Sequence, residues 1–204
     1  MLSDFPDGLL HSPIAMAVVD SASAGLRVAP RATIIQLRAP GLSARALERE
    51  ANELLASTSV PVIVSSRCDV ALACGAAGVN LPESDITVAD ARTLLGRRLV
   101  GRSVHSIDGA HQAERDGADF IIFGPVWQTA SHPGTRPVGV AALQLVVRSV
   151  RIPVLAIGGV AEDRIEECQA AGAAGYAAIG MFASRQVKRS RAKPGGGEPG
   201  VVWP

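Results

Sequence analysis

A chain of 204 residues, 48% of them hydrophobic and only 3% aromatic, suits a single domain whose core is filled by aliphatic side chains. Its 20 Lys and Arg residues balance 19 Asp and Glu residues, which excludes the strong one-signed field that attracts nucleic acid or an anionic membrane surface. The N-terminus has no basic segment followed by an apolar one, and no apolar run reaches about 18 residues, so we expect a cytoplasmic protein.

Short apolar runs rich in β-branched residues alternate along the chain with segments of helical period. This alternation is typical of repeated βα units and a parallel sheet. The predicted strands are residues 14–19, 33–37, 60–64, 78–81, 99–103, 119–123, 153–157 and 175–179. Because eight such strands close a barrel, we predict an α/β fold of the TIM (β/α)8 type.

Segments with helical patterns lie between these strands, at residues 43–57, 67–74, 87–95, 106–116, 140–150 and 161–171. Ser43 precedes one amphipathic stretch, and Ser106 or Asp108 begins another, so we expect these residues to cap helices. Gly75, Gly117 and Gly172 each stand between an Ala-containing helix and a strand. Glycine at such a place predicts a left-handed residue that ends the helix.

The first and last helices of a full barrel have little room in this sequence. Residues 21–32 allow only one or two turns of helix after the first strand. Residues 1–184 form the predicted barrel domain, while residues 185–204 form a basic, Pro- and Gly-rich tail that we expect to be disordered. With these helices shortened or absent, exposed strand surface would call for either partial opening of the barrel or a covering subunit in a homo-oligomer.

The loops that follow the strands of such a barrel meet at one mouth, where the active sites of this fold lie. The seventh predicted strand ends in Gly158 and Gly159, ahead of a predicted helix. Glycines let a phosphate approach bare backbone N–H groups, and a helix N-terminus adds a favourable dipole. We therefore predict a phosphate cradle at Gly158 and Gly159, with Gly180 after the eighth strand on its opposite side. The alternative is an ordinary tight turn between strand and helix.

The sixth predicted strand is followed by a long loop, residues 123–136, that is rich in hydroxyl groups and includes Thr129 and Ser131. A loop of this length at the mouth is typical of a functional lid, and the alternative is a solvated excursion. His132 in this loop is a candidate catalytic acid or base near neutral pH, against the alternative of an ordinary surface histidine. Ser103, at the end of the fifth strand, is the second candidate catalytic residue.

Charged and polar residues also follow the second and fourth predicted strands. Gln36 and Arg38 are two residues apart, so they face the same way, and the polar direction there is the barrel centre. An arginine at this place suits an anionic group, and the alternative is a structural salt bridge. Asp85 suits Mg²⁺ only with additional oxygen ligands, of which the neighbouring sequence offers a poor set.

Two kinds of chemistry find no support in the residue types present. Cys68, Cys74 and Cys168 show no CxxC spacing and are interpreted as reduced core residues. The only lysines, Lys188 and Lys193, lie in the tail, which excludes an aldolase that forms a Schiff base on a buried lysine.

Six segments in order resemble the thiamine phosphate synthase and thiazole tautomerase family, whose members are barrels that act on phosphorylated thiazole. The segments are residues 18–20, 35–38, 78–85, 101–105, 124–129 and 156–160. The resemblance implies that Gln36 and Arg38 contact the diphosphate of a pyrimidine substrate and that Asp85 helps to bind Mg²⁺. It also implies that Thr129 and the two glycines hold substrate phosphates, and we add Ser131 of the same loop to this group.

The sequence departs from the family pattern at residues that carry charge in the synthase. Pro40 stands in place of a lysine, residues 65–66 are Ser-Ser in place of Asn-Asp, and His132 stands in place of the lysine of Thr-x-Thr-Lys. Loss of one group that stabilises developing charge costs about 2.7 to 4 kcal/mol in other enzymes, so we expect weakened departure of diphosphate. The characteristic histidine of the tautomerase is Pro125 here, so His132 or His105 would have to replace it.

Two hypotheses on function follow, beside a third reading as a different isomerase of a phosphorylated sugar on the same fold. The first is an enzyme of thiamine biosynthesis that binds thiazole phosphate or thiamine phosphate, with either synthase-type condensation or tautomerase-type proton transfer as its reaction. The second is a catalytically diverged member that binds a phosphorylated ligand as a regulatory module. Both take a phosphorylated small molecule as partner.

Overall fold

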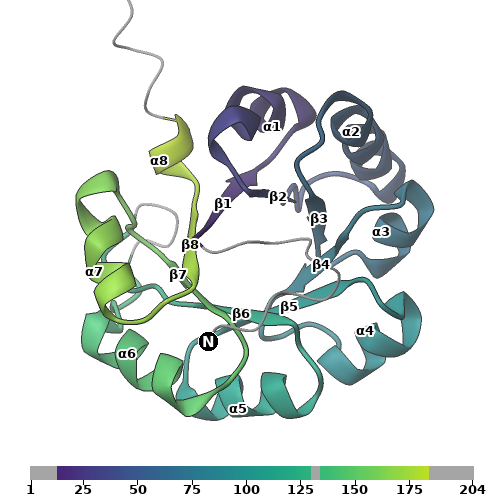
Figure 1. The fold of residues 1–204 in the computed structure, drawn as a ribbon. Coiled ribbons are helices and arrows are strands. Elements are labelled where there is room, and N and C mark those ends of the chain that lie inside the picture. Colours follow the sequence, from purple (N-terminus) through teal and green to yellow (C-terminus); the bar gives the residue numbers. More distant parts are fainter. Residues whose placement is uncertain (1–12, 130–133, 184–204) are drawn as a thin grey trace, which may run out of the picture.

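The computed structural model describes residues 13–129 and 134–183 and shows a closed barrel of eight parallel strands (Figure 1). The strands are β1 Ile14–Val19, β2 Ile34–Leu37, β3 Val62–Ser65, β4 Gly78–Leu81, β5 Leu99–Val104, β6 Phe120–Phe123, β7 Val154–Ile157 and β8 Gly175–Ala178. Each strand pairs with its neighbours in sequence, and β8 closes the ring by pairing with β1 through Ile14 and Gly175. The predicted TIM-type barrel is confirmed.

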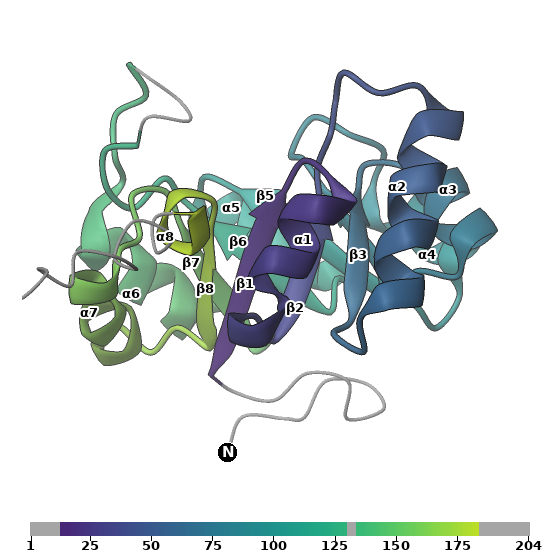
Figure 2. The same ribbon diagram turned by 90° about the horizontal axis from the view of Figure 1, so that it is seen from above.

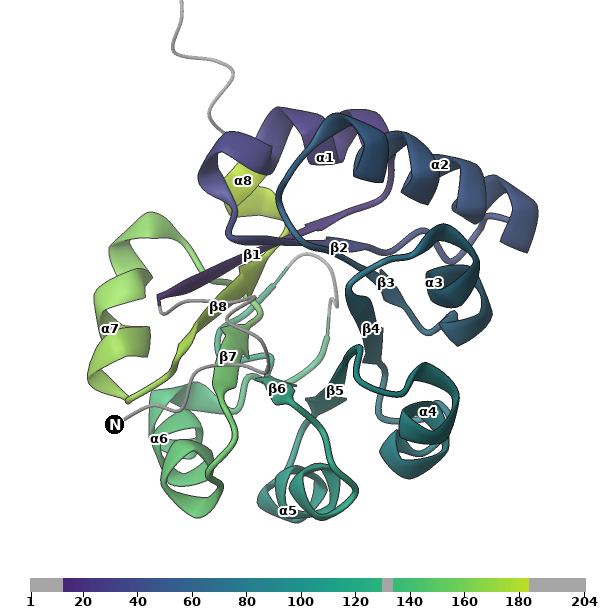
Figure 3. The same cartoon turned by 45° about the vertical axis from the view of Figure 1, so that its right-hand side comes forward.

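Helices surround the strands as an outer ring (Figures 1 and 3). They are α1 Ala22–Val28, α2 Ala44–Ser57, α3 Cys68–Cys74, α4 Val88–Leu95, α5 Ile107–Arg115, α6 Gly139–Ser149, α7 Ile165–Ala170 and α8 Gly180–Ala183, with 3₁₀ turns η2 Ala29–Arg31 and η3 Glu162–Arg164. The first helix has seven residues, so it is short, as expected, and α8 has four residues up to the end of the described chain. The guanidinium of Arg31 donates to the carbonyl of Phe182 and lies 5.7 Å from its ring centroid, which ties α8 to η2.

The ends of the helices follow the signals in the sequence. Ser43 Oγ accepts a hydrogen bond from the N–H of Ala46, and Ser106 Oγ accepts one from the N–H of Gly109, so both predicted caps are confirmed. The three predicted left-handed glycines that follow helices, Gly75, Gly117 and Gly172, have φ angles of 74°, 89° and 86°. Glycine adopts these angles without the steric cost that a Cβ would bring.

The core has two layers, one inside the barrel and one between the strands and the helices. The inner cluster contains Ile14, Met16, Val18, Ile34, Ile63, Leu99, Phe120, Ile122, Leu155, Ala174 and Ala177. Phe120 fills the barrel because Gly101 on the neighbouring strand has no side chain: a Cβ there would stand 2.2 Å from the ring. Close packing of this kind leaves the lower barrel filled, so ligands find space only at its mouth.

The helix predicted at residues 161–171 is wrong at its start. The chain remains extended at Ala161, passes through the 3₁₀ turn η3, and becomes α-helical only in α7. Glu162 and Asp163 occupy the first turn, where a bound anion would also have to lie. The part of the cradle prediction that rested on a helix dipole therefore has no support, and the backbone N–H groups of the glycine pair must carry it.

The loops at the carboxyl ends of the strands lie on one side of the molecule. Figure 2 shows the long loop between β6 and α6 rising on the same side as the loop between β2 and α2. These loops enclose the mouth of the barrel.

No helix in the described part of the chain is long and apolar enough to cross a membrane. Residues 185–204 lie outside the described residues, so the disordered tail stays a prediction, as do the cytoplasmic location and the homo-oligomer.

Candidate active site

A cavity of about 1370 Å³ occupies the mouth of the barrel. It is larger than the range of about 300 to 1,000 Å³ typical of pockets for one small molecule. Residues predicted from the sequence contribute to its lining: Gln36, Arg38, Ser103, Thr129, Gly158, Gly159 and Gly180. The structure therefore brings together the predicted residues that follow the second, fifth, sixth, seventh and eighth strands.

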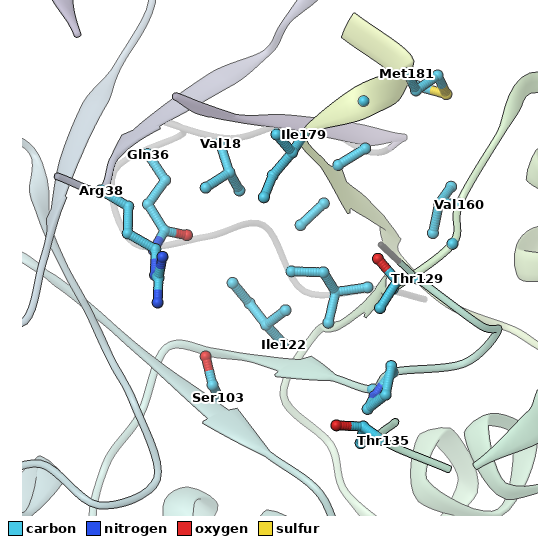
Figure 4. Close-up of a pocket in the computed structure, with 18 of the residues that line it drawn as sticks. Val18, Gln36, Arg38, Ser103, Ile122, Thr129, Thr135, Val160, Ile179 and Met181 are labelled. Carbon is cyan, nitrogen blue, oxygen red and sulfur yellow. The ribbon is translucent and has the colours of Figure 1, made fainter. Parts of the chain in front are cut away.

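Gln36 and Arg38 form one wall of the cavity, at the end of β2 (Figure 4). Gln36 is 3% exposed, whereas Arg38 is exposed to the cavity and the solvent above it. Within the described part of the chain Arg38 makes no ion pair, so the alternative of a structural salt bridge is not found there. An unpaired guanidinium at the mouth is suited to bidentate contact with a phosphate or diphosphate.

Asn80 and Ser103 lie deeper in the cavity, on the adjacent strands β4 and β5. Asn80 is 3% exposed, and its Nδ2 donates to Ser103 Oγ over 3.0 Å. The other amide atom, Oδ1, is buried with no hydrogen-bond partner. A buried polar atom without a hydrogen-bond partner usually lowers the free energy of unfolding by about 1 to 3 kcal/mol. An asparagine at position 80 therefore indicates a role other than stability.

Gly158 and Gly159 form the opposite wall. Both their backbone angles and the close approach of the β6 loop require residues without a side chain. Their φ angles of 90° and 68° are left-handed, and a Cβ on Gly158 would stand 2.4 Å from Pro125 Cβ. The loop after β6 is hydrogen-bonded to this turn through Trp127 N–H and the Gly158 carbonyl over 3.0 Å. Within the described residues, the N–H groups of Gly159 and Val160 are bonded to no protein acceptor. They remain available to an anion.

Arg164 is a cavity residue that the sequence reasoning missed. It lies in η3, donates from Nη1 to the carbonyl of Gly159 over 2.6 Å, and lies 5.2 Å above the ring of Trp127. The sequence signal was an arginine five residues after the glycine pair, which the predicted helix over this segment concealed.

His105 and Glu83 line the cavity at its rim. Nδ1 of His105 lies 2.5 Å from the carbonyl of Gly124, and Nε2 lies 4.0 Å from Glu83 Oε2. A carbonyl only accepts hydrogen bonds, so Nδ1 carries a proton and Nε2 of the neutral ring is the basic nitrogen. The pair is suited to moving a proton at the mouth.

Asp85, the predicted magnesium ligand, does not line the cavity. Its Oδ1 accepts the N–H of Ile86 over 2.8 Å. Residues 13–129 and 134–183 hold no group of three His, Cys, Asp or Glu side chains suited to a metal. These residues do not by themselves fit Mg²⁺, and Asp85 as a ligand stays a prediction.

Ser131 and His132 lie outside the described residues. Their predicted roles as a phosphate ligand and a catalytic acid or base stay predictions. Thr129, which precedes them, lies at the cavity beside Val160 in Figure 4.

Comparisons with known proteins agree on one family. A family model described as thiamine monophosphate synthase matches residues 13–182. A putative thiamine-phosphate synthase of Geobacter sulfurreducens is 41% identical over 183 residues, covering 87% of this chain and 84% of that protein. The thiamine-phosphate synthase of Chloroflexus aurantiacus is 39% identical over 176 residues, covering 84% of this chain and 79% of that protein.

Two solved structures are similar to this chain, one in sequence and fold and one in fold alone. Thiamine phosphate pyrophosphorylase from Pyrococcus furiosus has a TM-score of 0.74 and 31% identity, covering 81% of this chain and 85% of that one. FabK from Thermotoga maritima has a TM-score of 0.70 at 21% identity, covering 85% of this chain and 60% of that one, which shows the barrel fold alone.

Proposed function

The chain belongs to the thiamine monophosphate synthase family, and we propose that it binds thiazole phosphate or thiamine phosphate in the cavity at the mouth of the barrel. Family membership supports a role in thiamine biosynthesis. The observation that supports the binding proposal is one cavity with groups suited to an anion on two of its walls. Backbone N–H groups after β7 that are bonded to no described acceptor lie on one wall, and the guanidinium of Arg38, which makes no ion pair within the described residues, lies on the other.

The reaction that this arrangement supports is condensation of a pyrimidine diphosphate with thiazole phosphate. The bond between the pyrimidine methylene carbon and the diphosphate oxygen breaks, and the diphosphate leaves with the electron pair. The thiazole nitrogen then donates its lone pair to the methylene carbon, which yields thiamine phosphate. A cavity of about 1370 Å³ supports this proposal, because the two reactants must be held together.

Each wall has a separate part in this reaction. Arg38 would stabilise the negative charge of the departing diphosphate, and Gln36 beside it would orient the pyrimidine. The N–H groups of Gly159 and Val160, together with Thr129 and Gly180, would anchor the phosphate of the thiazole. With Pro40 in place of a lysine, fewer cations face the leaving group, so we expect slow condensation.

Proton transfer of the tautomerase type is the second candidate function. The position of His105 beside Glu83 at the rim of the cavity favours it. Its Nε2 faces the cavity rim near Glu83, which would stabilise the imidazolium after it takes a proton. Replacement by glutamine, His105→Gln, should abolish isomerisation of a thiazole phosphate carboxylate, whereas His132→Ala should leave it. The reverse result would assign the proton transfer to the loop histidine.

Two assays on the full chain test the proposed function. Calorimetry with thiamine phosphate and with unphosphorylated thiamine should show tighter binding of the phosphorylated compound. A coupled assay with pyrimidine diphosphate and thiazole phosphate should show formation of thiamine phosphate. Binding without any turnover would favour the diverged regulatory module, and absence of heat at millimolar ligand would overturn both readings.

A further inference from the structure

Arg164 is a cationic side chain at the phosphate cradle with most of its hydrogen-bonding capacity unused. A guanidinium has five N–H donors, and within the described residues the Arg164 side chain makes a single hydrogen bond, from Nη1 to the Gly159 carbonyl. None of the ion pairs among these residues includes it, although Glu162 also lines the cavity. A half-buried cation without a carboxylate partner has a cost that an anionic ligand would offset.

The orientation of this guanidinium is fixed from two directions. The carbonyl of Gly159 holds one edge, and the ring of Trp127 lies 5.2 Å from Cζ on one face. Both partners belong to segments that are themselves joined, since Trp127 N–H donates to the Gly158 carbonyl. A cation held in this way loses little conformational freedom when a ligand arrives, which favours binding.

This position keeps Nη1 of Arg164 next to Gly159, where an ideal Cβ would lie 3.2 Å from it, and Gly159, Val160 and Arg164 line the same cavity. Arg38, the other unpaired guanidinium of the cavity lining, stands at the end of β2, and Figure 4 places it across the cavity from Val160 and Thr129. The two cations therefore serve different ends of the cavity.

We propose that Arg164 binds the phosphate monoester of the ligand at the Gly158–Gly159 cradle and so supplies positive charge to this wall. This inference rests on the proposed function for the identity of the ligand, but not for its phosphate. A bidentate guanidinium prefers a dianionic phosphate to a neutral hydroxyl. Arg164 is thus the residue that separates phosphorylated from unphosphorylated thiazole compounds.

The test compares Arg164→Met with the wild-type protein by calorimetry, using thiamine phosphate, thiamine and inorganic phosphate. Methionine keeps an unbranched apolar stem over Trp127 and removes the charge. We expect about 10- to 100-fold weaker binding of thiamine phosphate and little change for thiamine. Arg164→Lys should recover only part of the loss, because the ammonium lacks the planar fork.

Arg31→Met is the matched control. Arg31 also stacks on an aromatic ring and donates to a backbone carbonyl, but it does not line the cavity. Its replacement should leave the phosphate preference unchanged, and circular dichroism should show that all three variants are folded.

The outcomes separate this inference from the proposed function. Equal affinity of wild type and Arg164→Met for thiamine phosphate overturns the role of Arg164 while the proposed function stands. Arg164-dependent binding of inorganic phosphate without preference for thiamine phosphate supports Arg164 and overturns the proposed ligand. Failure of the wild-type protein to bind any of the phosphate compounds overturns both.

Discussion

The amide of Asn80 on β4 donates to the hydroxyl of Ser103 on β5 over 3.0 Å, inside the candidate active site. The bond holds the side chain of Ser103, which lines the cavity, while Asn80 Oδ1 remains buried without a partner. The buried Oδ1 of Asn80 lowers the stability of the fold, whereas the bond from Asn80 to Ser103 holds the Ser103 hydroxyl in place. This combination is typical of residues kept for function.

Replacement of Asn80 by leucine should stabilise the protein and weaken its activity. Asn80→Leu removes the unpartnered oxygen, so the free energy of unfolding should rise by about 1 kcal/mol. Turnover should fall about 3- to 10-fold, because the hydroxyl of Ser103 loses its orienting donor. Urea unfolding and the coupled assay measure the two effects, with Ser103→Ala as the control for the hydroxyl itself. A stabilised variant with full activity would show that Asn80 does not position Ser103.

A methyl group at Gly158 should destabilise the fold more than one at Gly139. Both glycines are left-handed, with φ angles of 90° and 81°, so either change to alanine costs about 1 to 2 kcal/mol in backbone strain. A Cβ at Gly158 also stands 2.4 Å from Pro125, whereas nothing lies within 4 Å at Gly139. Overpacking adds about 1 to 3 kcal/mol for Gly158→Ala. Equal losses in the free energy of unfolding for Gly158→Ala and Gly139→Ala would show that the loop after β6 moves away from the new methyl group at no cost.

Loss of the ion pair between Arg92 and Asp119 should reduce stability without affecting ligand binding. The Arg92 Nη2 lies 2.6 Å from the Asp119 carboxylate, which also accepts the N–H of Val100, and Arg92 further donates to the Gly117 carbonyl. These residues lie at the amino ends of β5 and β6, away from the mouth. Arg92→Met should lower the free energy of unfolding by about 2 to 3 kcal/mol and leave the affinity for thiamine phosphate unchanged. A change in that affinity would contradict the claim that contacts at the amino ends of the strands do not affect ligand binding at the carboxyl ends.

Burial raises the pKa of the Cys168 thiol from 9.0 to about 11. The folded state then binds its proton more tightly than the unfolded state, so the stabilising contribution is present below about pH 9 and is lost as the pH rises through about 11. The free energy of unfolding should therefore decrease across this window in the wild-type protein. Cys168→Ala should show a shallower decrease, and parallel pH profiles for the two proteins would contradict the assigned pKa.

The barrel could be predicted from the sequence because buried parallel strands appear as short apolar runs. Gln36, Arg38 and the glycine pair could be predicted because each lies at the carboxyl end of a strand or directly after it. The bond between Asn80 and Ser103 depends on the register of β4 against β5, which no local pattern encodes.

Asp85 also follows a strand, but the direction of its loop could not be read from the sequence. The guanidinium of Arg102 holds this loop by donating to the carbonyls of Glu83 and Ile86. Arg164 was concealed because a helical period does not distinguish a 3₁₀ turn from the first turn of an α-helix.

A crystal structure of the protein with thiamine phosphate tests the central claim most directly. The account predicts the phosphate group within hydrogen-bond distance of the N–H groups of Gly159 and Val160, with the pyrimidine ring toward Gln36. A phosphate bound at Arg38 with the glycine turn empty, or a ligand outside the cavity, would contradict it.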